Sequence, residues 1–124
     1  VIEVPNDFNP LQMAVQKSLD KNQYWISIPD HVNYFNFKSL ENILKKTKFQ
    51  LFYKDTTFPL ELFLLMGFDY LNNDKIGREK HNERMKLEMN LGKSGYHDLK
   101  KKLYHSFAQN GIGRTAIVFG KKIS

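Results

Sequence analysis

The pattern of apolar residues predicts three short strands separated by helices. Three stretches are rich in β-branched and aromatic residues, as is typical of strands: 1–4, 49–53 and 115–119. Asn9, Pro10 and Gln12 have the spacing of a helix start with a capping box, and this helix is expected to run to about Asp20. The apolar stretch 24–28 is irregular, so we predict an ordered loop there.

A second helix is predicted to begin after Asn36, whose side chain can accept hydrogen bonds from the free N–H groups of the first turn. Apolar residues follow at helical spacing: Phe37, Leu40, Ile43 and Leu44. Three more helices are predicted over 60–71, which is apolar almost all round, over 78–91, and over the stretch with Leu99, Leu103 and Phe107. Gly111 then stands in the usual position of a left-handed cap.

The length of 124 residues is enough for one domain with a real core, and we expect residues 1–124 to form a single domain. The absence of cysteine excludes disulfides and thiolate chemistry and agrees with a cytoplasmic location. The longest apolar run is far shorter than a membrane span, so no membrane partner is expected. The chain opens within an apolar run and without methionine, which suggests a fragment of a longer protein.

The net charge of +6 and the pI near 9.5 would suit a polyanionic partner such as nucleic acid. The lysines, however, are spread largely near helix ends and on polar faces, where most such residues are simply solvated. We therefore expect no specific nucleic-acid binding, and keep a non-catalytic basic α/β binding module, for nucleic acid or a protein partner, as the alternative function.

Several common kinds of site are not indicated. Gly111-Ile112-Gly113 follows a helix and precedes a strand, the reverse of the strand-to-helix setting of phosphate-binding loops. The four histidines lack metal-ligand spacing, so no metal is expected. No serine stands in the Gly-x-Ser-x-Gly turn of the α/β-hydrolases.

The order VIEVPN, PDHVNYF, SLENILKKTKF and a hydrophobic strand resembles the C-terminal half of class I S-adenosylmethionine-dependent methyltransferases, from their fifth strand onward. The resemblance implies an α/β fold: the C-terminal part of a Rossmann-like methyltransferase fold, with a small mixed three-stranded sheet, helices and a helical insertion. It also implies that the last strand lies between the other two and antiparallel to both. Lys48 stands where the family usually has a glycine, so either Lys48 adopts positive φ or the helix ends differently.

The same resemblance implies which residues form the site. In similar enzymes the substrate lies over the C-terminal ends of the fourth and fifth strands, which here places Asn6, Phe8, Trp25 and Tyr34 as substrate-binding residues. His31 is the candidate catalytic residue, because imidazole can take a proton near neutral pH. The alternative stays open that Asp30 caps a turn and that His31 only packs on Tyr34.

The function expected from the resemblance is transfer of a methyl group to a small-molecule acceptor. This chain would supply the acceptor side, and S-adenosylmethionine would be bound through an N-terminal half that the chain lacks, so the chain alone is expected to be inactive. A stand-alone interaction domain that uses the Phe-rich helix 62–68 is a third possibility. The open edges of a small sheet also make a homodimer plausible.

Overall fold

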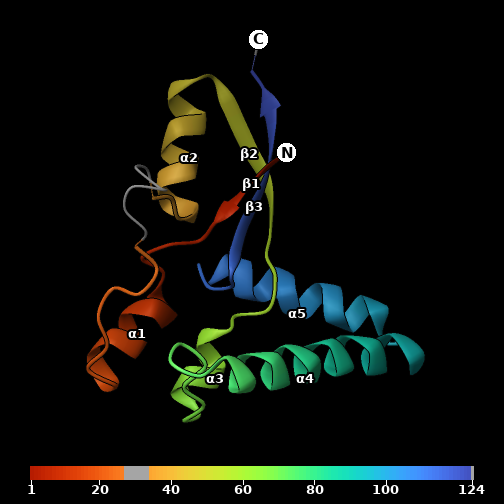
Figure 1. Cartoon of the computed structure of the whole chain (residues 1–124). Coiled ribbons are helices and arrows are strands. Elements are labelled where there is room, and N and C mark those ends of the chain that lie inside the picture. The colour runs from red at the N-terminus through yellow and green to blue at the C-terminus, as the bar shows by residue number, and fades with distance from the viewer. Residues whose placement is uncertain (27–33, 124) are drawn as a thin grey trace.

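The computed structural model describes residues 1–26 and 34–123. Within this part, the chain forms an α/β fold with a three-stranded open sheet and five helices, as Figure 1 shows. Helix α2 covers one face of the sheet, while α1, α3, α4 and α5 gather at its lower end in that view. Predicted site residue His31 lies outside the described residues.

The sheet has the strand order β1-β3-β2, with β1 at Ile2–Pro5, β2 at Phe49–Asp55 and β3 at Thr115–Lys122. Strand β3 is antiparallel to both neighbours, with Val4 opposite Ala116 and Lys54 opposite Val118. The predicted position and direction of the last strand are therefore confirmed. The expectation of a mixed sheet is wrong, because β1 and β2 run the same way but never pair with each other.

The first two helices begin as predicted. Helix α1 spans Pro10–Ser18 and is capped by the Asn9 side chain, which accepts from the backbone N–H of Gln12 at 3.1 Å, while the Gln12 side chain accepts from the Asn9 N–H. Helix α2 spans Phe37–Lys46, and its cap Asn36 accepts from the Ser39 N–H at 3.0 Å. The caps fix where the chain enters each helix.

Lys48 connects α2 to β2 and has a φ of +63°, so of the two expected alternatives it adopts the left-handed conformation that favours glycine. Its carbonyl accepts a hydrogen bond from the N–H of Ile123 at 2.8 Å, which ties the turn to the end of β3. This turn allows α2 to fold back onto the sheet.

The later helices differ in length from the prediction. Helix α3 covers only Glu61–Leu65 rather than 60–71, because Gly67 has a φ of +100° and ends the helical path. Helix α4 starts earlier than residue 78 and spans Asp74–Lys93, since Asn73 caps it. Helix α5 spans His97–Gln109 and, as predicted, ends before a left-handed Gly111.

The buried residues form two clusters. The first lies between α2, α5 and the sheet: Phe37, Leu40, Leu44, Ala108, Ala116 and Val118. The second joins the segment around α3 to α5: Phe58, Phe63 and Tyr104. None of the described helices is long and apolar enough to cross a membrane.

Candidate functional site

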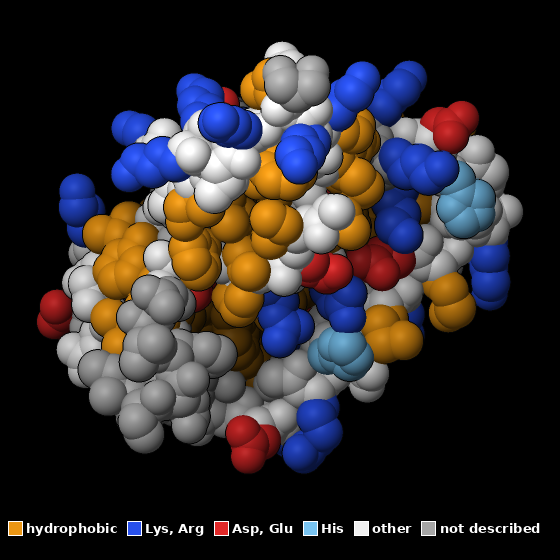
Figure 2. All heavy atoms as spheres, turned by 90° about the horizontal axis from the view of Figure 1, so that it is seen from above, with side chains coloured by type: hydrophobic (Ala, Val, Ile, Leu, Met, Phe, Trp, Pro, Cys, Tyr) orange, Lys and Arg blue, Asp and Glu red, His pale blue; other side chains and the backbone are white. Residues whose placement is uncertain are grey.

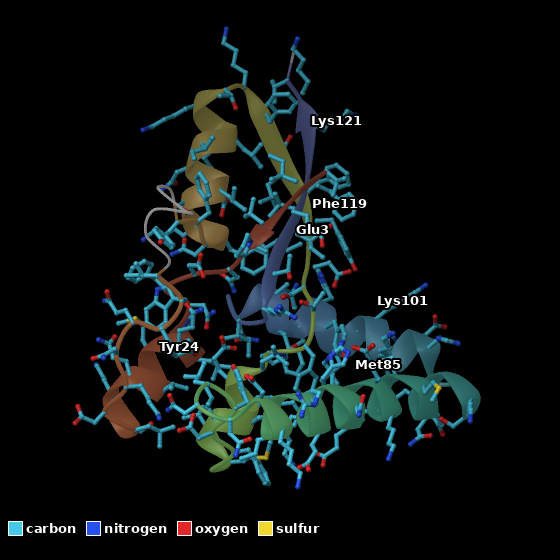
Figure 3. All side chains as sticks on the ribbon, viewed as in Figure 1. Glu3, Tyr24, Met85, Lys101, Phe119 and Lys121 are labelled. Atoms are coloured by element: carbon cyan, nitrogen blue, oxygen red, sulfur yellow. The ribbon has the colours of Figure 1, made fainter. Side chains whose placement is uncertain are left out.

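A cleft of about 620 Å³ opens beside the C-terminal end of β1. Its walls come from the end of β1, from α1, from the turn at Tyr24 and Trp25, from the segment that leads into α3, from α4 and from the start of β3. Tyr24 lies next to α1 in Figure 3. Ligands of open α/β sheets bind outside the carboxyl ends of strands, so this cleft is the candidate site.

Three of the predicted substrate-binding residues lie together. The ring of Phe8 meets Trp25 edge-on with centroids 5.2 Å apart, and it meets Tyr34 in the same way at 6.1 Å. Trp25 also contacts Tyr24, at 5.1 Å. Of the predicted residues, Trp25 lines the cleft. The aromatic group therefore forms one wall of the site, with Phe8 and Tyr34 supporting it.

Asn6, the remaining predicted substrate-binding residue, is almost completely buried, with 1% of its surface exposed. Its amide nitrogen donates to the carbonyls of Gly111 and Gly113, each at 3.0 Å. Its backbone carbonyl accepts from the side chain of Asn9 at 2.7 Å. Asn6 thus connects the end of β1 to the glycine turn before β3 and holds the wall of the cleft in place.

Glu61 is a cleft residue that the sequence prediction missed. Its side chain is buried, with 5% of the residue exposed, and its Oε2 atom receives no hydrogen bond from the described residues. Burial raises the pKa of this carboxyl above its ordinary value, and the nearby charge of Asp7 adds to the increase, whereas Arg114 and a hydrogen bond with Gln12 oppose it. A carboxyl in such a setting can accept a hydrogen bond or a proton.

Two tyrosines share this environment. Burial raises the pKa of Tyr24 and of Tyr70, and the neighbouring Glu61 carboxylate raises both further. The Tyr24 hydroxyl lies near Glu61 without a hydrogen bond of good geometry, and it has no other partner among the described residues. Both phenols therefore keep their protons at neutral pH.

A signal for Glu61 is present in the sequence. It is the only charged residue in the run from Phe58 to Phe68, and a carboxylate within such an apolar run is costly to bury unless it has a use. Tyr24 and Trp25 are more than 35 residues away from it along the chain, so the pattern alone does not place Glu61 beside them.

Comparison with known proteins gives no match: no family model, no curated protein and no solved structure matches the chain. In the described part of the chain, histidine, aspartate and glutamate form no group of three that could hold a metal ion.

The raised pKa of Glu61 predicts a pH-dependent stability difference between wild type and Glu61→Gln. In the unfolded chain the carboxyl ionises near pH 4.3, roughly its ordinary value, whereas in the folded chain it holds its proton to higher pH. Wild type therefore loses stability relative to Glu61→Gln as pH rises through the folded pKa, by about 1.4 kcal/mol for each pKa unit of increase.

Urea unfolding of both proteins between pH 4 and pH 8, roughly from the ordinary carboxyl pKa upward, measures the difference. Glu41→Gln, which removes a carboxylate on α2 outside the cleft, controls for the change in net charge. If the stability of wild type minus that of Glu61→Gln stays constant or increases from pH 4 to pH 8, the prediction is wrong.

Proposed function

We propose that this chain forms the acceptor-binding side of an S-adenosylmethionine-dependent methyltransferase, and that a cofactor-binding half of the same protein completes the enzyme. The observation that carries the proposal is the strand order β1-β3-β2, with the last strand antiparallel between the other two. The resemblance to class I methyltransferases implies this order for their last three strands. The position of the cleft at the end of β1 supports a small-molecule acceptor.

The described residues do not by themselves fit S-adenosylmethionine. The glycines with positive φ nearest the sheet, Gly111 and Gly113, follow a helix and precede β3, whereas nucleotide-type cofactors sit where a strand passes through glycines into a helix N-terminus. The cofactor supplies the methyl group once bound elsewhere in the enzyme. The contribution of this chain is to bind and orient the acceptor, which is the main requirement of an in-line displacement.

His31 stays the proposed general base, in a segment outside the described residues. It follows Trp25, which lines the cleft, by six residues along the chain. A base at that position would remove the proton of a hydroxyl or of an acidic carbon in the acceptor.

The alternative, a basic binding module, has one observation in its favour. Exposed lysines gather where α2 ends and the far ends of β2 and β3 pair: Lys45, Lys46, Lys48, Lys121 and Lys122. Figure 2, which views the molecule from this end, shows Lys and Arg side chains spread over much of that face. Such a cluster attracts phosphate backbones without selecting a sequence.

The proposal predicts that this chain alone does not bind S-adenosylmethionine, while a protein that joins it to its upstream coding sequence does. Isothermal titration calorimetry on both proteins measures the difference. We expect micromolar affinity in the longer protein and no detectable heat in the chain alone.

Two outcomes would contradict this function. Micromolar binding of S-adenosylmethionine by the chain alone would show that the missing-half interpretation is wrong. Nanomolar binding of duplex DNA at physiological salt, with a preferred sequence and no cofactor binding in the longer protein, would favour the basic binding module.

A further inference from the structure

Three buried polar atoms of cleft residues receive no hydrogen bond of good geometry from the described residues: the Tyr24 hydroxyl, the Trp25 indole nitrogen and Glu61 Oε2. The Tyr24 hydroxyl and Glu61 lie near each other. Leaving one buried polar atom unsatisfied costs about 1–3 kcal/mol. A ligand that accepts from the Trp25 nitrogen and replaces the poor contact between Tyr24 and Glu61 would remove this cost.

The charges around the cleft are mixed. Carboxylates come from Glu3, Asp7 and Glu61, and guanidinium groups come from Arg84 and Arg114. A cationic ligand would meet the two guanidinium groups, and an anionic ligand would meet the three carboxylates. A neutral ligand with hydroxyl groups avoids both repulsions, because each hydroxyl can donate to a carboxylate and accept from a guanidinium.

Aromatic residues form a further part of the lining. Tyr24, Trp25, Phe58 and Tyr70 all line the cleft, and flat aromatic faces pack well against the C–H groups of a saturated ring. The volume of about 620 Å³ lies within the range of small-molecule sites, roughly 300–1,000 Å³. A single sugar ring fits in this space with room for a substituent.

We propose that the cleft binds a neutral, hydroxyl-bearing ring molecule, a sugar or a similar polyol, and that Glu61 accepts a hydrogen bond from one of its hydroxyls. The buried donors of Tyr24 and Trp25 bind other oxygens of the same molecule. Because these atoms are covered, the Tyr24 or Trp25 side chain turns aside as the ligand enters. This inference rests on the proposed function in one respect: the proposed function makes this ligand the methyl acceptor.

The test uses the fluorescence of Trp25, the only tryptophan of the chain, which lies in the wall of the cleft. The chain is titrated with methyl glucoside, methyl galactoside and methyl mannoside, and with benzylamine and benzoate as a cationic and an anionic comparison. We expect a saturable change with at least one glycoside in the millimolar range and none with the two charged probes. A response to a charged probe, or to no probe, overturns the proposal.

Glu61→Gln and Glu41→Gln test the role of the carboxylate. Above the pH at which Glu61 ionises in the folded chain, loss of a charge-assisted hydrogen bond is expected to weaken glycoside binding about tenfold or more in Glu61→Gln and to leave it unchanged in Glu41→Gln. Urea unfolding confirms beforehand that both variants are folded. Equal affinity in the two variants overturns the assignment of Glu61. These titrations contain no cofactor, so their failure is distinct from a failure of the calorimetric test of the methyltransferase.

Discussion

Asn6→Asp is expected to lower the free energy of unfolding at neutral pH by about 3–5 kcal/mol, the cost of an uncompensated buried charge. In the wild type the Asn6 amide donates to two backbone carbonyls at 3.0 Å, in a site that is almost completely buried. An aspartate would place carboxylate oxygens against those carbonyl oxygens. Both hydrogen bonds would be lost and replaced by repulsion.

Urea unfolding at pH 7 and at pH 4 measures this effect, the two values being chosen roughly to span the titration of a buried carboxyl. At pH 4, roughly the ordinary carboxyl pKa, protonation of the introduced carboxyl provides one O–H donor. The Asn6→Asp variant is therefore expected to regain part of its stability at the lower pH. Asn22→Asp, at an exposed position, adds the same charge and serves as the control. If the two variants unfold at the same urea concentration, Asn6 is not the link that its hydrogen bonds indicate.

The three strands and the two capped helices were predictable because local chemistry decides them. β-branched residues favour extended backbone, and the side chains of Asn9 and Asn36 satisfy N–H groups only a few residues away. The order of the strands is not local. It came from the resemblance to methyltransferases, since nothing in the pattern of residues 115–122 specifies an insertion between β1 and β2.

The extent of the third helix could not be predicted from its apolar pattern. The run from Leu60 to Leu71 has helical composition, but Gly67 turns the chain away after Leu65. Met66, beyond the helix end, is 61% exposed, so the run is not buried on all sides as its composition suggests. A glycine in an apolar run is compatible with both a packed helix and a helix end, and tertiary contacts decide between them.

The candidate site, too, has one part that was predicted and one part that was not. The grouping of Phe8, Trp25 and Tyr34 was predicted from the resemblance to methyltransferases, since 17 residues separate Phe8 from Trp25 along the chain. Glu61 enters the cleft only because α3 packs against α1, a contact between segments about 50 residues apart. The sequence could mark Glu61 as unusual, but only the fold places it beside Tyr24.

Gly113→Ala is expected to destabilise the chain by about 3 kcal/mol or more, from backbone strain of about 1–2 kcal/mol and overpacking of about 1–3 kcal/mol. Gly113 has a φ of +113°, which L side chains rarely adopt. A Cβ there would overlap the Thr56 side chain. Thr56 cannot turn away freely, because its hydroxyl donates to the Thr115 carbonyl at 2.7 Å.

Gly111→Ala is the matched control, since Gly111 has a φ of +75° and its nearest new neighbour would be Pro10 Cδ at 3.9 Å. It is expected to cost only the strain of about 1 kcal/mol. Urea unfolding of both variants, of Thr56→Gly, and of Gly113→Ala combined with Thr56→Gly, separates the two contributions as a double-mutant cycle. Removing the Thr56 side chain should make the Gly113→Ala penalty smaller than it is in wild type. An unchanged penalty would mean that the positive φ alone requires glycine at residue 113. Contact with Thr56 would then not contribute.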